Sequence, residues 1–261
     1  MKVKNIHVAY FSATYTTRQI IKGISTHFQG IISEHDLTQN DVYQPTKLAP
    51  DDLLIVGMPV YAGRIPAMAA ERLKKITGEQ TPAILIVVYG NRDYDDALLE
   101  LQDIAIGNGF SPISAGAFVA QHSIFPKVGI SRPDRADHEI INDFAEKSAK
   151  ILEELPINTT PSPLAVKGNR PYKTPGNIPL TPQGNSKCNH CGTCVRLCPS
   201  GAISAESPRK TDKSKCIACG RCIVVCPHRA RHFGGLLYWI AGRKFVKANS
   251  ARKEAEVFFQ H

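Results

Sequence analysis

Five short apolar runs, separated by amphipathic stretches, make up the first 155 residues of the chain. The runs that we expect to form buried strands lie at residues 4–11, 31–37, 52–58, 82–89 and 114–120. After the first run, Ile20, Ile24 and Phe28 recur at helical spacing, so they would cover one face of a helix. Strands that alternate with helices of about 10–15 residues predict βαβ units and a doubly wound parallel sheet.

Three loops follow the first, third and fourth of these strands, at residues 12–17, 59–66 and 90–94. With the strand order 2-1-3-4-5, the carboxyl ends of these strands meet at the sheet edge where ligands bind. The first loop, Ser12-Ala13-Thr14-Tyr15-Thr16-Thr17, offers five hydroxyl groups just before a predicted helix. The first N–H groups of a helix have no partner within it, so this loop suits a phosphate dianion. A plain Ser/Thr helix cap would have the same composition.

The remainder of the chain differs in composition from the first 155 residues. A last helix is expected to begin after Ser131-Arg132-Pro133-Asp134 and to end near Leu155. Residues 156–183 contain seven prolines, which exclude a long helix and predict either an extended strap along the first domain or a loose tether. Residues 234–261 combine aromatic and basic side chains. We expect them to pack on the two domains, with a basic amphipathic membrane helix as the alternative.

All eight cysteines of the chain fall in two runs that superpose cysteine on cysteine and proline on proline. The runs are Cys188-x2-Cys191-x2-Cys194-x3-Cys198-Pro199 and Cys216-x2-Cys219-x2-Cys222-x3-Cys226-Pro227. With this spacing, the last cysteine of each run binds the other cluster. We therefore predict two 4Fe–4S clusters, one on Cys188, Cys191, Cys194 and Cys226 and one on Cys216, Cys219, Cys222 and Cys198. Zinc would leave the third cysteine of each run unused, and disulfides are typical of small secreted domains.

The charge is divided unevenly between the two parts of the chain. Residues 1–155 carry 15 Lys and Arg against 19 Asp and Glu, whereas residues 156–261 carry 17 against 4. A basic region can bind nucleic acid or an anionic membrane. Clusters held by thiolates are themselves negative, however, so counter-charge for the clusters and for an acidic redox partner is the nearer explanation.

The cysteine motifs make residues 184–233 resemble the clostridial-type two-cluster ferredoxins. Phe11-Ser12-Ala13-Thr14-Tyr15-Thr16-Thr17 resembles the FMN phosphate loop of flavodoxins, with Tyr15 where that family has glycine. Met58-Pro59-Val60-Tyr61 and Tyr89-Gly90-Asn91-Arg92 correspond to the two loops that clasp the isoalloxazine ring in that family. This likeness covers residues 4–155, and the whole chain is similar to the ferredoxin–flavodoxin fusion family.

The resemblance implies an α/β fold: a flavodoxin-like doubly wound parallel sheet of five strands, with a second, small α+β two-cluster ferredoxin domain. The expected divisions are residues 1–155 for the FMN domain, 156–183 for the strap, 184–233 for the ferredoxin domain and 234–261 for a C-terminal extension. The residues that the resemblance assigns to FMN are Ser12, Thr14, Tyr15, Thr16, Thr17, Pro59, Val60, Tyr61, Gly90, Asn91, Arg92 and Tyr94. His122 either packs and caps or lies near the flavin.

The implied function is electron transfer between FMN and the two clusters, with conversion between one-electron and two-electron carriers. An FMN-dependent reductase of a small substrate is one alternative, and a redox or iron sensor is another. We expect acidic redox partner proteins, no nucleic acid and no stable membrane insertion, because no apolar run approaches the ~18 residues that span a bilayer. The N-terminus lacks the pattern of a signal peptide, so a cytoplasmic location is expected.

Overall fold

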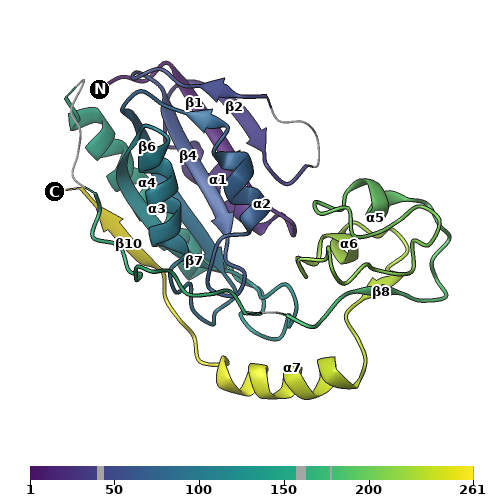
Figure 1. Ribbon diagram of the computed structural model, residues 1–261. Coiled ribbons are helices and arrows are strands. Elements are labelled where there is room, and N and C mark those ends of the chain that lie inside the picture. The colour runs from purple at the N-terminus through teal and green to yellow at the C-terminus, as the bar shows by residue number, and fades with distance from the viewer. Residues whose placement is uncertain (40–43, 157–162, 177, 261) are drawn as a thin grey trace.

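A six-stranded sheet forms the larger part of the molecule (Figure 1). The computed structural model describes residues 1–39, 44–156, 163–176 and 178–260, so residues 157–162 and 177 of the predicted strap lie outside the described residues. Five strands of the sheet are parallel: β1 (Asn5–Tyr10), β2 (Ile31–Asp36), β4 (Leu53–Pro59), β6 (Thr81–Tyr89) and β7 (Phe110–Val119). Their spatial order, β2-β1-β4-β6-β7, is the predicted order 2-1-3-4-5. The flavodoxin-like fold class is therefore confirmed.

The sixth strand was not predicted. β10 (Glu256–Phe259) pairs antiparallel with β7, placing Val257 opposite Gly116 and Phe259 opposite Ser114. Its neighbour in the sheet belongs to the first half of the chain, so no local pattern predicts the pairing. The C-terminal extension therefore does more than pack on the two domains: it adds an edge to the sheet.

Helices cover both faces of the sheet, as a doubly wound fold requires. The first face carries α1 (Thr16–Ser25) and α4 (Arg135–Glu154). Ile20 and Ile24 of α1 pack with residues of β1, β4 and β6, and Phe144 of α4 packs on Phe118 of β7. The other face carries α2 (Ala67–Leu73) and α3 (Ala97–Gly107). α4 begins with a capping box in which Asp134 and Asp137 each accept from the other's backbone N–H. A small parallel ladder of β3 (Thr46–Lys47) and β5 (Ile76–Thr77) lies apart from the main sheet.

The strap lies along α3. Leu164 is buried and exchanges hydrogen bonds with the Gln102 side chain. Farther along, the Tyr172 hydroxyl donates to Asp103, and the backbone N–H of Lys173 donates to Asp96 at 2.6 Å. The strap is therefore held to the first domain by both packing and hydrogen bonds.

A second, smaller unit lies beside the carboxyl end of the sheet (Figure 1). It contains the short helices α5 (Thr193–Arg196) and α6 (Arg221–Val224) and the antiparallel pair β8 (Gln183–Gly184) and β9 (Arg231–His232). The chain then forms α7 (Leu236–Ala248), whose Tyr238 and Phe245 pack on Phe125 while Leu236 and Trp239 are exposed. No helix in the described ranges is both long enough and apolar enough to cross a bilayer.

Candidate functional site

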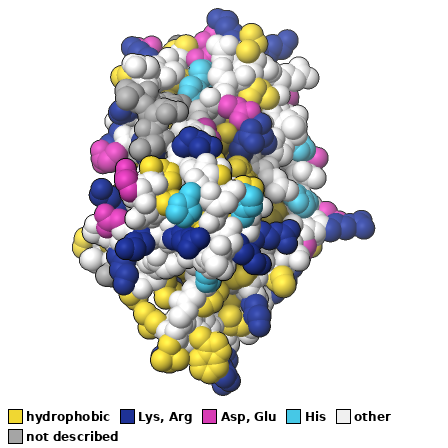
Figure 2. Space-filling view, turned by 90° about the vertical axis from the view of Figure 1, so that its right-hand side faces the viewer, with side chains coloured by type: hydrophobic (Ala, Val, Ile, Leu, Met, Phe, Trp, Pro, Cys, Tyr) yellow, Lys and Arg dark blue, Asp and Glu magenta, His cyan; other side chains and the backbone are white. Residues whose placement is uncertain are grey.

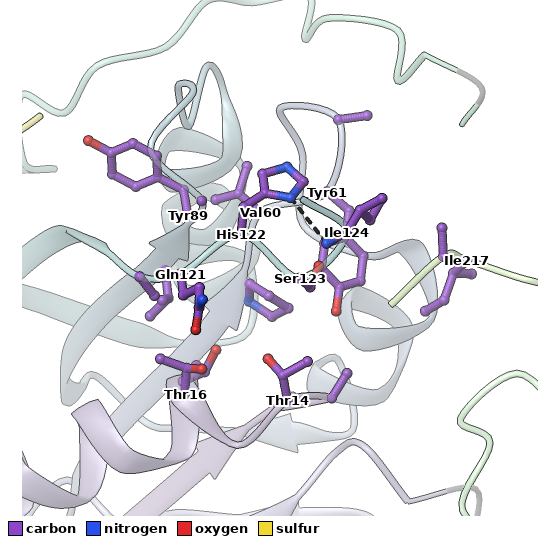
Figure 3. A pocket seen from close by; sticks show the side chains of 18 of the residues that line it. Thr14, Thr16, Val60, Tyr61, Tyr89, Gln121, His122, Ser123, Ile124 and Ile217 are labelled. Atoms are coloured by element: carbon purple, nitrogen blue, oxygen red, sulfur yellow. Dashed lines mark hydrogen bonds between the residues drawn. The ribbon is translucent and has the colours of Figure 1, made fainter. Parts of the chain in front are cut away.

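One pocket lies where the strand ends of the sheet meet the small unit (Figure 3). Its walls enclose about 640 Å³ of space when the open mouth is included. Residues from the three predicted loops line it: Thr14, Thr16, Thr17, Pro59, Val60, Tyr61 and Gly90.

The first loop ends at the N-terminus of α1 with an uncapped turn. Tyr15, the residue before the helix, has φ 68° and caps nothing with its side chain. Thr14, Thr16 and Thr17 make no side-chain hydrogen bond to any other described residue, whereas the Ser12 hydroxyl accepts from the Arg18 N–H at 3.0 Å. Free hydroxyls and free helix N–H groups together form a cradle for an anion.

Tyr61 and His122, which come from separate loops, both line the pocket (Figure 3). The Tyr61 ring meets Phe11 edge-on, with centroids 6.5 Å apart, and burial raises the pKa of its hydroxyl, which stays protonated at neutral pH. His122 Nδ1 accepts from the N–H groups of Ile124 and Phe125, both at 3.1 Å. Burial, with a smaller contribution from Arg92, lowers the pKa of His122 to about 4, so its ring is neutral at physiological pH.

Five of the residues that the resemblance assigned to FMN do not line this pocket. Ser12 is buried behind the loop, and Tyr15 faces the small unit. Asn91 donates to the carbonyls of Asn249 and Ala251, at 2.9 and 2.8 Å. Arg92 pairs with Asp95, and the buried Tyr94 hydroxyl donates to Glu256 at 2.5 Å. The structure thus directs Asn91, Arg92 and Tyr94 away from the pocket, two of them toward the returning C-terminal segment.

Residues outside the three loops also line the pocket. They are Gln121, His122, Ser123 and Ile124 in the turn after β7, together with Ile178, Ile217 and Ala218. A place near the flavin was one of the two expectations for His122, and the whole turn could be found from the sequence, since the fifth strand of a parallel sheet ends at the same edge as the others. Ile217 and Ala218 could not, because their position depends on how the two units dock.

The eight thiols, all free, surround two further pockets in the small unit. Cys188, Cys191, Cys194 and Cys226 line the first, which we call the distal pocket. Cys198, Cys216, Cys219 and Cys222 line the second, the proximal pocket. The two enclose closely similar space, about 310 and 290 Å³. Each therefore contains the four cysteines that crossed ligation requires, and the equal size suits two occupants of one kind.

The backbone around the two pockets repeats along with the cysteine runs. Gly192 and Gly220 occupy equivalent left-handed positions, with φ 76° and 77°, which favour glycine. The backbone N–H of Ala202 donates to Cys198 Sγ and that of Ala230 to Cys226 Sγ, both at 3.3 Å. Hydrogen bonds of this kind stabilise thiolates and so favour iron binding.

The proximal pocket directly adjoins the sheet domain. Cys219 is packed into the apolar core beneath the strand ends, and burial raises the pKa of its thiol to about 12. A Cβ on Gly220 would lie only 3.5 Å from the Ser123 carbonyl and 3.6 Å from Thr14 Cγ2. The Arg221 guanidinium lies 4.5 Å from the centre of the Tyr15 ring. The cysteine loop and the pocket loop are therefore in direct contact.

The family comparison bears on the small unit. Residues 187–230 match the model of the 4Fe-4S dicluster domain. We call this segment the dicluster domain. Two 4Fe–4S clusters are therefore confirmed as its cofactors, and the predicted order, a flavodoxin-like domain followed by a two-cluster ferredoxin domain, is confirmed as well.

The remaining comparisons concern the sheet domain. No curated protein matches the chain. A short-chain flavodoxin associated with a non-canonical PDU bacterial microcompartment is 17% identical, with 57% of this chain and 98% of that chain covered and a TM-score of 0.42. Flavodoxin 1 from Bacillus cereus is 12% identical, with 59% and 100% covered and a TM-score of 0.40. The chain spans 37% of the rubredoxin oxygen:oxidoreductase of Desulfovibrio gigas, at 15% identity, 59% coverage of this chain and a TM-score of 0.40.

Proposed function

We propose that this protein transfers electrons between an FMN in the pocket of the sheet domain and a redox partner, through the two clusters of the dicluster domain. One observation carries the proposal: Ile217 and Ala218, between the proximal ligands Cys216 and Cys219, line the same pocket as the loops after β1, β4 and β6. Two redox sites built by separate domains thus share a wall. A contact of this kind would keep the two redox sites adjacent, as electron transfer between them requires.

The pocket residues fit FMN in two respects. The free hydroxyls of Thr14, Thr16 and Thr17, with the N-terminus of α1, would hold the phosphate. Tyr61 and the turn that contains His122 would hold the flat ring between them. When bound, FMN supplies chemistry that accepts electrons singly or in pairs, whereas each cluster passes one at a time. The combination would convert between one-electron and two-electron carriers.

The ligand sets of the clusters follow from the two thiol pockets. We assign the distal cluster to Cys188, Cys191, Cys194 and Cys226, and the proximal cluster to Cys198, Cys216, Cys219 and Cys222. Burial raises the pKa of Cys219 to about 12 and that of Cys222 to about 11, so iron has to displace their protons on binding. The electron path would run from the pocket to the proximal cluster and then to the distal one.

The distal cluster would be the exchange point with a partner. Cys191 is exposed, and Arg196 and Arg209 donate to the backbone carbonyls of Cys191 and Cys188. Figure 2 shows Lys and Arg side chains in a band across the face on this side of the molecule. A surface of this charge suits an acidic redox protein. Clusters held by reduced thiols fit a reducing compartment such as the cytoplasm.

An anaerobic preparation tests the cofactor set directly. We expect one FMN and eight iron and eight sulfide ions per chain, and a reductive titration followed by visible and EPR spectra in which both clusters and the flavin are reduced. A colourless, zinc-containing protein, or one with clusters but no flavin under FMN excess, would overturn the proposal. Sustained turnover of a quinone or disulfide would indicate the reductase instead.

Paired threonine variants test the phosphate site. Thr14→Val with Thr16→Val removes two hydroxyls that would bind a dianion, and we expect FMN affinity to fall at least tenfold, since hydrogen bonds to charged groups contribute ~1.5–3 kcal/mol each. Thr26→Val is the matched control, because its hydroxyl is at the other end of α1 and donates to Gly23 O at 2.7 Å. Equal FMN affinity in both variants would show that these threonine hydroxyls do not bind the FMN phosphate.

A further inference from the structure

Two buried arginines of the dicluster domain each have one nitrogen without a partner. Across the described residues, Arg221 Nε and Arg231 Nε are the buried side-chain nitrogen or oxygen atoms that make no hydrogen bond. Their side chains belong to residues that are 5% and 2% exposed. A buried N–H left unpaired costs about 1–3 kcal/mol, so native proteins seldom keep one without a use for it.

Other nitrogens of the two guanidinium groups bind protein. Arg221 Nη1 donates to the carbonyl of Ala13 at 3.2 Å and more weakly to that of Ser12 at 3.4 Å. Arg231 Nη1 donates to Pro208 O at 2.6 Å and Nη2 to Pro182 O at 2.8 Å. The Nη contacts fix each guanidinium in place. In each case the buried Nε stays without a partner.

Each arginine lines one of the two cluster pockets. Arg221 lines the proximal pocket and Arg231 the distal pocket. The Arg231 side chain also lies within hydrogen-bonding reach of the Cys222 thiol, which belongs to the proximal set. A cation with a spare N–H therefore stands in the wall of each pocket, and Arg231 lies between the two.

The internal repeat shows that these arginines are not part of the shared motif. When the two runs are aligned cysteine on cysteine, Arg231 corresponds to Ile203, which lines the proximal pocket, and Arg221 corresponds to Thr193, which lines the distal pocket. Ligand spacing and backbone turns repeat, yet both arginines belong to the second half of the repeat, and the first half has Thr193 and Ile203 in their places. Each pocket nevertheless receives one.

We propose that Arg221 and Arg231 donate their Nε–H to sulfur atoms of the proximal and distal clusters, respectively, and thereby raise the reduction potential of each. The inference rests on the proposed function, since it requires both clusters. The reason is electrostatic: reduction adds a negative charge in a site of low polarity, where a buried cation and an N–H···S hydrogen bond stabilise the reduced form more than the oxidised form.

Two arginine variants test the assignment, each expected to affect mainly its own cluster. In EPR-monitored titrations, Arg221→Met should lower the midpoint of the proximal cluster, and Arg231→Met should lower that of the distal cluster most and the proximal one less. A tenfold loss in the reduction equilibrium corresponds to about 59 mV for one electron. Arg209→Met is the control. It removes the same charge from an exposed side chain beside Cys188, where solvent screens it, so its shift should be several-fold smaller.

Two further measurements cover the case in which a methionine variant fails to load its clusters. Arg231→Lys keeps the charge but has no Nε–H, and its distal midpoint should lie between those of the wild type and Arg231→Met. In the wild-type protein labelled with 15N at arginine Nε, the reduced clusters should show a 15N hyperfine coupling that Arg231→Lys weakens.

Two results separate the inference from the function on which it rests. Unchanged midpoints in fully loaded variants, or no 15N coupling, would overturn the role of the arginines while the electron-transfer function stands. A wild-type protein that binds no clusters or no FMN would overturn the function itself.

Discussion

The sheet domain and the dicluster domain are stabilised in different ways. Apolar layers cover both faces of the sheet, with Ile, Leu, Val and Phe side chains fully buried between sheet and helices. The buried cluster at the centre of the dicluster domain has five members, Cys194, Cys198, Ala202, Ile203 and Cys222, and three of them are thiols. The first domain is held by burial of apolar area. The second has too small a core for that, and it depends on bonds to iron.

Removal of iron should produce the largest difference in stability between the two domains. Because the dicluster domain has almost no apolar core of its own, the chelated protein should lose amide protection from hydrogen exchange across residues 184–233. The amides of β6 should keep theirs, because that strand is buried within the sheet. Exchange read out by mass spectrometry, before and after anaerobic chelation, measures both. Full protection of residues 184–233 without iron would show that the dicluster domain does not depend on iron for its stability.

Substitution of the cysteine that each run contributes to the other cluster should remove one cluster at a time. Cys198→Ser should abolish the proximal cluster and Cys226→Ser the distal one, since each side chain lines the pocket of the opposite run. EPR spectra and iron content report which cluster is left, and flavin-to-cluster transfer should fail in Cys198→Ser. Loss of the cluster nearest in sequence would show that the ligation is not crossed.

The neutral His122 should make the stability of the folded protein decrease in moderate acid. Its pKa falls from about 6.5 in the unfolded chain to about 4 in the folded protein, so the unfolded state binds the proton first as pH falls. This contribution becomes negligible near pH 7.5, costs about 1.4 kcal/mol at pH 5.5 and reaches about 3 kcal/mol below pH 4.

The matched variant is His122→Asn, whose Oδ1 can accept from Ile124 and Phe125 without titrating. Urea unfolding midpoints at pH 7.5 and 5.5 should differ less in this variant than in the wild type. An equal difference in the two proteins would show that His122 is not the group that titrates.

Tyr15→Gly should have the smallest effect, because two contributions oppose each other. Glycine relieves a left-handed backbone at φ 68°, worth about 1 kcal/mol. It also removes the aromatic ring stacked on Arg221, worth about 0.5–2 kcal/mol. These opposing terms should leave thermal stability changed by less than about 1 kcal/mol. A loss larger than the whole cation–π contribution would instead make this stack a principal contact between the domains.

The parts of the molecule that the sequence predicts are those with a local pattern. The parallel strands follow from short apolar runs, and the two thiol sets follow from fixed spacing and a repeated Cys-Pro step. The side chains of Asn91 and Tyr94 were predicted for the pocket but bind residues 249–256. Their orientation depends on a segment close to the C-terminus, so no analysis of their own loop could reveal it. The same holds for Arg221, whose partners Ser12 and Ala13 belong to the other domain.

The returning strand β10 makes the dicluster domain an insertion within the sheet domain. The chain leaves the sheet after α4, forms the cysteine loops and α7, and comes back to pair with β7. A protein synthesised from its N-terminus therefore exposes the edge of β7 until the cysteine segment has been made. The chain enters and leaves the dicluster domain through segments that are held on the sheet domain, so we expect this restraint at both ends to keep the domain close to the pocket.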